Sequence, residues 1–216
     1  MSKHALIEHR PWLLASVIAA VAYYFLWNNP IGGLWLILLK GAGVGLLAIY
    51  AMRRAPGFDG AILVVVLALS AAADMALELS FEAGGGLFFA SHLIAIALYL
   101  RNRRERTSPS QNLLALALFI ATPGVAYLLS ERADIAFYAS GLGGMAALAW
   151  LSRFPRYRVG IGAVLFVVSD WLIFSRMGAL DLEPLPDILI WPLYYAGQLM
   201  IATGVVQTLR GERPAK

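Results

Sequence analysis

The chain has 216 residues, of which 60% are hydrophobic and only 14% are charged, and its mean hydropathy is +0.72. This composition excludes an ordinary soluble domain and predicts one integral membrane domain over residues 1–216, with short loops. The absence of cysteine excludes disulfides, thiolate catalysis and cysteine-ligated metals. The net charge of +4 comes from basic residues scattered over several loops, so nucleic acid is not an expected partner.

Apolar runs follow one another along the whole chain. A helix needs about 20 mostly apolar residues to cross roughly 30 Å of hydrocarbon, and it satisfies its own backbone hydrogen bonds inside lipid. The runs are continuous and do not alternate with polar residues, so an all-α polytopic transmembrane bundle of about eight spans is predicted. The predicted spans are residues 12–27, 31–52, 58–80, 84–100, 111–129, 134–151, 158–177 and 188–209.

The first run, residues 12–27, has two interpretations. Lys3 and Arg10 precede its short apolar core, and Ala20-Val21-Ala22 resembles the cleavage site of a secretory signal. The aromatic residues that follow this site are instead typical of the interfacial belt of a membrane helix. We favour a retained helix, whereas cleavage would leave seven spans.

The charges of the loops predict the orientation of the bundle. One set of turns carries most of the Lys and Arg residues together with both terminal segments, so the positive-inside rule places both termini in the cytoplasm. This basic set is Lys3, Arg10, Arg53, Arg54, Arg101, Arg103, Arg104, Arg106, Arg153, Arg156, Arg158, Arg210, Arg213 and Lys216. The alternate turns carry Arg132 and Arg176 beside Glu82, Glu131, Asp134, Asp181, Glu183 and Asp187. A bacterial-type inner or plasma membrane is the expected location.

Five polar side chains interrupt the apolar runs: Lys40, Asp74, His92, Asp170 and Gln198. A charge at the centre of a span costs roughly 2.5–3.5 kcal/mol on insertion scales, so such residues are candidates for function. Counted at about 1.5 Å per residue from the outer ends of the helices, all of them lie roughly 9–15 Å beneath the outer hydrocarbon boundary. This shared depth predicts a single polar pocket in the outer half of the bundle.

Helical spacing adds three companions to these residues. Glu78 follows Asp74 by four positions and therefore shares its helix face. Tyr194 and Tyr195 precede Gln198 by four and three positions, which places their phenols along the same stripe.

The sequence disfavours a serine hydrolase and a zinc protease, and it leaves a structural role open for two of the polar residues. The chain has no G-x-S-x-G or H-E-x-x-H motif, and no metal or other cofactor is predicted. Ser91 precedes His92, but adjacent helical residues point about 100° apart, so a Ser–His dyad is disfavoured. A purely structural role stays open for Gln198 as an interhelical hydrogen-bonding group and for Lys40 as the counter-ion of an Asp.

Short motifs surround the polar residues in a fixed order along most of the chain. They are Lys40-Gly41, Ala73-Asp74, Phe81-x-x-Gly84-x-x-x-Phe88-x-x-x-His92, Gly162-Ala163-x-Leu165-Phe166-x-x-Ser169-Asp170 and Tyr194-Tyr195-x-x-Gln198. Their order and spacing resemble the YhhN-like lysoplasmalogenase family, which consists of integral membrane hydrolases of ether lysolipids. The chain departs from the family pattern at Gly41, Ala73 and Ala95, where the family has Pro, Gly and Tyr.

The resemblance implies that the chain hydrolyses the vinyl-ether bond of a lysoplasmalogen to a fatty aldehyde and glycerophosphocholine or glycerophosphoethanolamine. One carboxylic acid and one carboxylate would suit that chemistry, so Asp74 and Asp170 are assigned as the acid/base pair without deciding which donates the proton. His92 would orient the water or an Asp. Lys40 would keep one carboxylate ionised. The candidate substrate-binding residues are Lys40, Glu78, Tyr194, Tyr195 and Gln198.

The expected partners are therefore a lysolipid and the bilayer, and the sequence does not indicate an oligomeric state. A non-enzymatic transporter, a lipid-binding protein or a receptor would show the same polar residues within its spans. Release of aldehyde from a lysoplasmalogen separates the hydrolase from these alternatives.

Overall fold

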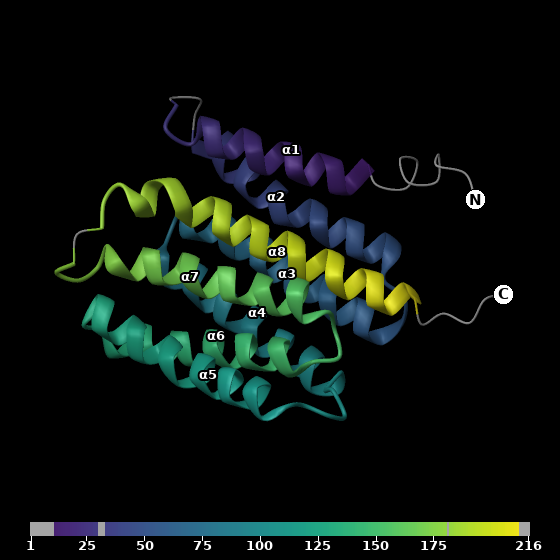
Figure 1. The fold of residues 1–216 in the computed structure, drawn as a ribbon. Coiled ribbons are helices and arrows are strands. Elements are labelled where there is room, and N and C mark those ends of the chain that lie inside the picture. Colours follow the sequence, from purple (N-terminus) through teal and green to yellow (C-terminus); the bar gives the residue numbers. More distant parts are fainter. Residues whose placement is uncertain (1–10, 30–32, 181, 212–216) are drawn as a thin grey trace.

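The computed structural model describes residues 11–29, 33–180 and 182–211. In this part of the chain eight α-helices lie side by side and there is no strand, as the sequence predicts (Figure 1). The helices are α1 (Pro11–Leu26), α2 (Gly33–Arg54), α3 (Gly57–Leu77), α4 (Phe81–Arg101), α5 (Pro109–Ser130), α6 (Ala133–Leu151), α7 (Ile161–Ser175) and α8 (Leu185–Gly211), with a π-helical turn η2 (Arg156–Gly160) leading directly into α7.

The observed helix ends fall within three residues of the predicted span ends. Within the described ranges, seven helical segments are long and apolar enough to cross a membrane, with η2 and α7 counted as one. The remaining helix, α1, has 16 residues and is therefore about 24 Å long. Polar caps set some of the boundaries: Ser108 and Gln111 form a reciprocal capping box at the start of α5, with Pro109 as its first residue.

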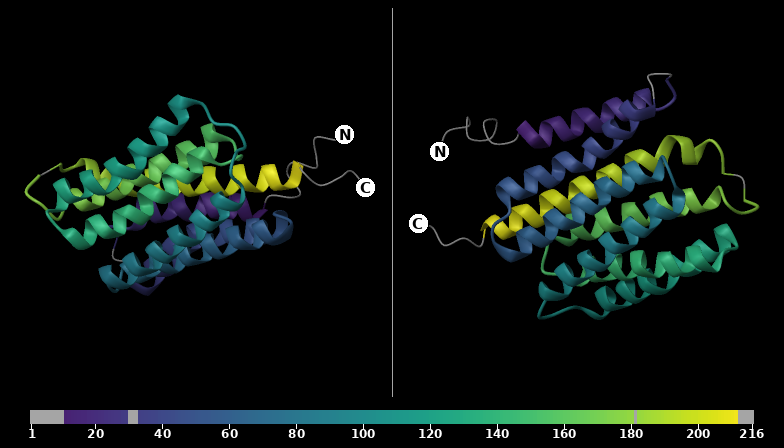
Figure 2. Two further views of the ribbon diagram at one scale, coloured as in Figure 1. Left: turned by 90° about the horizontal axis from the view of Figure 1, so that it is seen from below. Right: turned by 180° about the vertical axis from the view of Figure 1, so that it is seen from behind.

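The helices are arranged in three groups across the bundle. The α1–α2 pair lies on one side, the α5–α6 pair lies on the other, and α3, α4, α7 and α8 lie between them (Figure 1). The two further views in Figure 2 agree with this order. The four central helices bring the segments around Asp74, His92, Asp170 and Gln198 together, so the site is built between them and the flanking pairs.

Two glycines allow α7 and α8 to cross at very short distance. A Cβ atom on Gly197 would lie 2.5 Å from the carbonyl oxygen of Gly162, and a Cβ on Gly162 would lie 2.7 Å from that of Gly197. Small residues of this kind drive close helix packing in lipid, where no hydrophobic force acts between helices. The crossing fixes α7, which carries Asp170, against α8, which carries Tyr194.

Helix α1 is tied to the rest of the bundle by buried hydrogen bonds. The Ser16 hydroxyl donates to the carbonyl oxygen of Gly43 on α2 at 2.5 Å, and the Trp191 indole on α8 donates to the carbonyl of Ala20 at 2.9 Å. Ser16 and Ala20 are both buried. The structure thus places α1 in the packed bundle.

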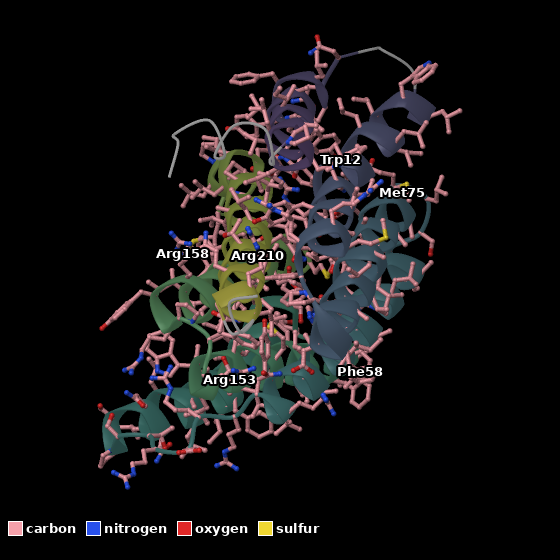
Figure 3. The ribbon with its side chains drawn as sticks, turned by 90° about the vertical axis from the view of Figure 1, so that its right-hand side faces the viewer. Trp12, Phe58, Met75, Arg153, Arg158 and Arg210 are labelled. Atoms are coloured by element: carbon pink, nitrogen blue, oxygen red, sulfur yellow. The ribbon has the colours of Figure 1, made fainter. Side chains whose placement is uncertain are left out.

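The two ends of the bundle differ in charge. The end where α1 begins and α8 ends, called the basic end, is seen in Figure 3, which labels Arg153, Arg158 and Arg210 there. The opposite end, called the acidic end, carries the charges of the alternate turns: Glu78, Glu82, Glu131, Arg132, Asp134, Arg176, Glu183 and Asp187. Lys3, Arg10, Asp181, Arg213 and Lys216, which also enter the orientation argument, lie outside the described residues.

We predict that the basic end faces the cytoplasm, and single cysteines test this because the chain has none of its own. Leu79, 78% exposed in the turn between α3 and α4, lies at the acidic end, and Arg106 is exposed at the basic end. A membrane-impermeant maleimide should label Leu79→Cys in intact cells, and Arg106→Cys only after permeabilisation. The reverse pattern of labelling would overturn the orientation.

Candidate functional site

An apolar cavity with one buried carboxyl group lies between α4, α6 and α7, near the acidic end. This cavity, here called the Asp170 cavity, has a volume of about 290 Å³. Asp170 and Tyr138 are the polar groups of its interior, while the exposed residues Glu82, Arg132 and Asp134 lie at its mouth. Its apolar wall includes Phe81, Phe88, Phe89, Phe137, Ile173 and Phe174.

Asp170 belongs to a hydrogen-bonded triad formed by three helices. The Tyr138 hydroxyl on α6 donates to Oδ2 of Asp170 on α7 at 2.8 Å, and Nε2 of His92 on α4 lies 3.1 Å from the Tyr138 oxygen. Because the Tyr138 proton points to Asp170, the His92 contact requires a proton on Nε2 of the imidazole. His92 is 2% exposed and Asp170 is 5% exposed.

Tyr138 is the member of this triad that the sequence argument missed. A phenol in an apolar run carries no charge and resembles an ordinary core or interfacial residue. The available signal was its position four residues after Asp134, which places both on one face of α6 near the outer end. Its role becomes visible only when α4, α6 and α7 are packed together.

Asp74 forms a second triad of the same kind on the other side of the central helices. The Tyr194 hydroxyl donates to Oδ2 of Asp74 at 2.8 Å, and the side-chain amide of Gln198, one helical turn further along α8, interacts with Tyr194. The two triads differ in the third group, since an imidazole can exchange a proton and an amide cannot. Asp74 is 1% exposed and is not among the residues lining the Asp170 cavity.

Packed aromatic rings lie between the two triads, so the two aspartates, which were predicted to line one pocket, have different surroundings. The Phe88 ring lies 5.6 Å from the rings of both Phe166 and Tyr194, and the Phe166 ring lies 5.1 Å from that of His92. The Phe166 ring also lies 5.0 Å from that of Tyr194, so these aromatic side chains connect His92 to Tyr194. Periodicity gives the direction of a side chain and does not give the volume of its neighbours.

His92 and Gln198 approach each other around a very small enclosed space that Ser70 and Ser91 also line. Ser91 donates to the carbonyl oxygen of Val66 at 3.0 Å and its hydroxyl lies 2.9 Å from that of Ser70. The hydroxyl of Ser91 is therefore engaged with α3, in keeping with the expectation that it forms no dyad with His92.

Lys40 and Glu78 line a second cavity between α1, α2 and α8, here called the Lys40 cavity, with a volume of about 250 Å³. The Lys40 ammonium forms an ion pair with Oε1 of Glu78 at 2.6 Å, and the Tyr23 hydroxyl donates to the same oxygen at 3.2 Å. Lys40 was expected to be the counter-ion of one of the two Asp residues. Its direct ion-pair partner is Glu78, one helical turn nearer the acidic end than Asp74, and its charge also interacts with that of Asp74.

Tyr195 points away from both cavities and toward α1. Its hydroxyl lies 2.7 Å from that of Ser16, and its ring stacks on Trp191 at a centroid distance of 6.2 Å. The two adjacent side chains on α8 thus point in different directions: Tyr194 points to Asp74, and Tyr195 points to α1. The sequence had grouped the two phenols because three- and four-residue spacings share one broad helix face.

Comparison with known proteins supports the order of motifs found in the sequence. The model of the YhhN family matches residues 35–205, a range that includes both triads and the Lys40–Glu78 pair. Two relatives named lysoplasmalogenase, from Mycobacterium bovis and Mycobacterium tuberculosis, are each 31% identical over 179 residues, which cover 76% of this chain and 68% of the relative. No solved structure matches the chain.

Proposed function

The chain belongs to the YhhN family, and on this premise we propose that it is a lysoplasmalogenase of the bacterial plasma membrane. It would hydrolyse the vinyl-ether bond of a lysoplasmalogen to a fatty aldehyde and glycerophosphoethanolamine or glycerophosphocholine. The observation that carries the proposal is a buried carboxyl group, Asp170, in the wall of an apolar cavity of a multi-pass membrane protein. The relatives named lysoplasmalogenase support the same activity.

The Asp170 cavity suits a lipid that has one hydrocarbon chain. Its aromatic and aliphatic wall would hold the chain, and the charged groups at the mouth would face the polar head. Asp134 at the mouth and Tyr138 in the interior are four residues apart on α6, which is about 6 Å along the helix. Only a few bonds separate the phosphate of a lysolipid from its ether oxygen. The head could therefore lie beside Asp134 while the vinyl ether lies at the level of Tyr138.

Asp170 would supply both proton transfers of the reaction. As a carboxylic acid it protonates the second carbon of the alkenyl chain, and the first carbon becomes an oxocarbenium ion bound to the ether oxygen. The carboxylate that remains then removes a proton from the water adding to the first carbon, which forms a hemiacetal and restores the acid. Collapse of the hemiacetal releases the aldehyde and the glycerophospho-alcohol, so the reaction consumes one water and no net proton.

Tyr138 and His92 would position Asp170 and stabilise its charged form. The phenol donates to Oδ2, which leaves Oδ1 as the oxygen we assign to the substrate and water. A hydrogen bond to an ionised carboxylate is stronger than one to a neutral acid, so the Tyr138 bond favours the state that follows proton transfer. His92 holds the phenol in this orientation through its Nε2.

Asp74 is assigned a different task from the one that the sequence suggested. Together with Tyr194 and Gln198 it joins α3 to α8 behind the aromatic rings. We propose that it holds these helices in register and does not contact the lipid. One carboxylate then serves as acid and base in turn, as a single residue does in retaining glycosidases.

The test is the release of aldehyde by the purified protein in lipid nanodiscs. Plasmenyl lysophosphatidylethanolamine should yield aldehyde, measured with a coupled alcohol dehydrogenase, while the acyl analogue without a vinyl ether should yield none. The Asp170→Asn variant controls for contaminating hydrolases. Absence of aldehyde from the wild-type protein would refute the proposal, and lipid binding or solute movement without turnover would establish the carrier alternative.

A further inference from the structure

The Lys40 cavity holds charged and aromatic groups that hydrolysis at Asp170 does not use. We propose that it is a second binding site, which takes the phosphoryl–ammonium zwitterion of a glycerophospholipid headgroup. The site is distinct from the Asp170 cavity, and the proposal stands whether or not the chain is a hydrolase. Two sources can present this chemistry: the head of a second lysolipid and a free glycerophospho-alcohol.

The charges of the cavity select a ligand that carries both signs. Lys40 and Arg176 line it together with Glu78 and Asp187. Lys40 pairs with Glu78 at 2.6 Å, and the Arg176 guanidinium forms ion pairs with Asp187 and with Glu183, which is not among the residues lining the cavity. A lone phosphate would meet two carboxylates and a lone ammonium would meet two cations. A zwitterion can pair with all of these groups and leave no charge without a partner.

Aromatic side chains provide the surface that an ammonium group prefers. Tyr23, Tyr24, Trp27 and Trp191 line the same cavity. The Lys40 ammonium already lies 5.7 Å from the centroid of the Tyr23 ring, which shows that a cation is accommodated over this face. Cation–π contacts of this kind are the usual means by which proteins hold quaternary and primary ammonium ligands.

The aromatic wall is held in place by the surrounding helices. Pro192 lacks an N–H group, so the carbonyl oxygen of Ile188 on α8 loses its helical donor, and the Tyr24 hydroxyl approaches that oxygen at 3.3 Å. The Trp191 indole is fixed by its bond to Ala20, and its ring lies 4.5 Å from that of Tyr23. A site whose side chains are already ordered loses less entropy when a ligand binds.

The position of the cavity fits a headgroup. Its volume is about 250 Å³. It lies at the acidic end, where Glu78 and Asp187 are near the ends of their helices. Glu78 lines this cavity while its neighbour Leu77 lines the Asp170 cavity, so the two sites open at the same end on different sides of α3.

Binding of defined probes tests the proposal on the full chain in nanodiscs. Glycerophosphoethanolamine and glycerophosphocholine represent the free alcohol, and ³¹P NMR line broadening reports their binding. Glycerol 3-phosphate and choline represent the separate charges. Acyl lysophosphatidylethanolamine represents the lipid source, and native mass spectrometry of the detergent-solubilised protein counts the molecules bound. We expect the zwitterions to bind at least about tenfold more tightly than either separate charge, a difference of about 1.4 kcal/mol.

Matched variants locate the binding. Arg176→Gln should weaken binding at least about tenfold, whereas Arg210→Gln, which replaces an exposed arginine at the basic end that lines neither cavity, should leave it unchanged. Trp27→Leu should weaken zwitterion binding but not glycerol 3-phosphate binding, with Trp35→Leu as its control because Trp35 is 68% exposed and lies outside the cavity. Thermal unfolding of each variant reports whether it is folded.

The outcomes separate the two sources and the two sites. Binding of the free alcohols that depends on Arg176 identifies the released product as a ligand. Binding of two lysolipid molecules, one of which is lost in Arg176→Gln, identifies a second lipid. Either result supports the site, and the binding that depends on Arg176 should persist in Asp170→Asn, which separates this site from catalysis. The proposal is overturned if no probe binds in a manner that depends on Arg176, or if Arg210→Gln and Arg176→Gln weaken binding equally.

Discussion

Replacing Asp170 by asparagine is expected to lower kcat for lysoplasmalogen hydrolysis at least about 100-fold, with the protein still folded. Asparagine keeps the size of the side chain and can accept the hydrogen bond from Tyr138, but it cannot donate and then recover a proton. General acid–base catalysis contributes about 10²- to 10⁴-fold, so loss of the only group in the cavity proposed to transfer protons should remove at least the lower figure. Aldehyde release gives kcat, and thermal unfolding reports the fold.

Asp74→Asn is the matched control for this substitution. Both aspartates are buried in central helices, and each accepts a hydrogen bond from a phenol at 2.8 Å. We expect Asp74→Asn to lower kcat less than about tenfold, because asparagine can still accept the bond from Tyr194 and no proton transfer is assigned to this group. Equal losses in the two variants would contradict this assignment and restore the acid/base pair inferred from the sequence.

The fold could be predicted from hydropathy because lipid imposes a simple constraint. Every spanning segment must be helical and about 20 residues long, so composition alone locates the helices. The hydropathy pattern does not define where each helix begins or how closely two helices cross. The capping box at Ser108 sets the start of α5, and Gly162 and Gly197 set the close crossing of α7 and α8. The first span left two interpretations open, since α1 has 16 residues and is shorter than each of the seven segments long enough to cross a membrane.

The candidate site was predicted less completely than the fold. Charged and strongly polar residues stand out in an apolar sequence, and this contrast identified Asp170 and His92. The same contrast could not identify Tyr138, because its phenol carries no charge. It also could not show that the direct ion-pair partner of Lys40 is Glu78 and not an aspartate. Both outcomes depend on which helices are neighbours and on the aromatic side chains that fill the space between them. One sequence does not determine those contacts.

Replacing Tyr138 by phenylalanine is expected to lower kcat about 10- to 100-fold while KM changes little. The substitution removes the hydroxyl that donates to Asp170 and accepts from His92. A hydrogen bond to a charged group is worth about 1.5–3 kcal/mol, and the bond strengthens only after Asp170 has given up its proton. The loss should therefore affect the chemical step more than lipid binding.

Tyr194→Phe and a double-mutant cycle distinguish this role from simple packing. Tyr194→Phe removes an equivalent buried hydroxyl beside Asp74, so a purely structural effect would be similar in the two variants, whereas we expect Tyr194→Phe to keep most of the activity. In the Asp170→Asn background, Tyr138→Phe should cause little further loss, because the charged state that it stabilises no longer forms. Losses that multiply in the double variant would show that Tyr138 acts independently of Asp170, and the proposed triad would then be wrong.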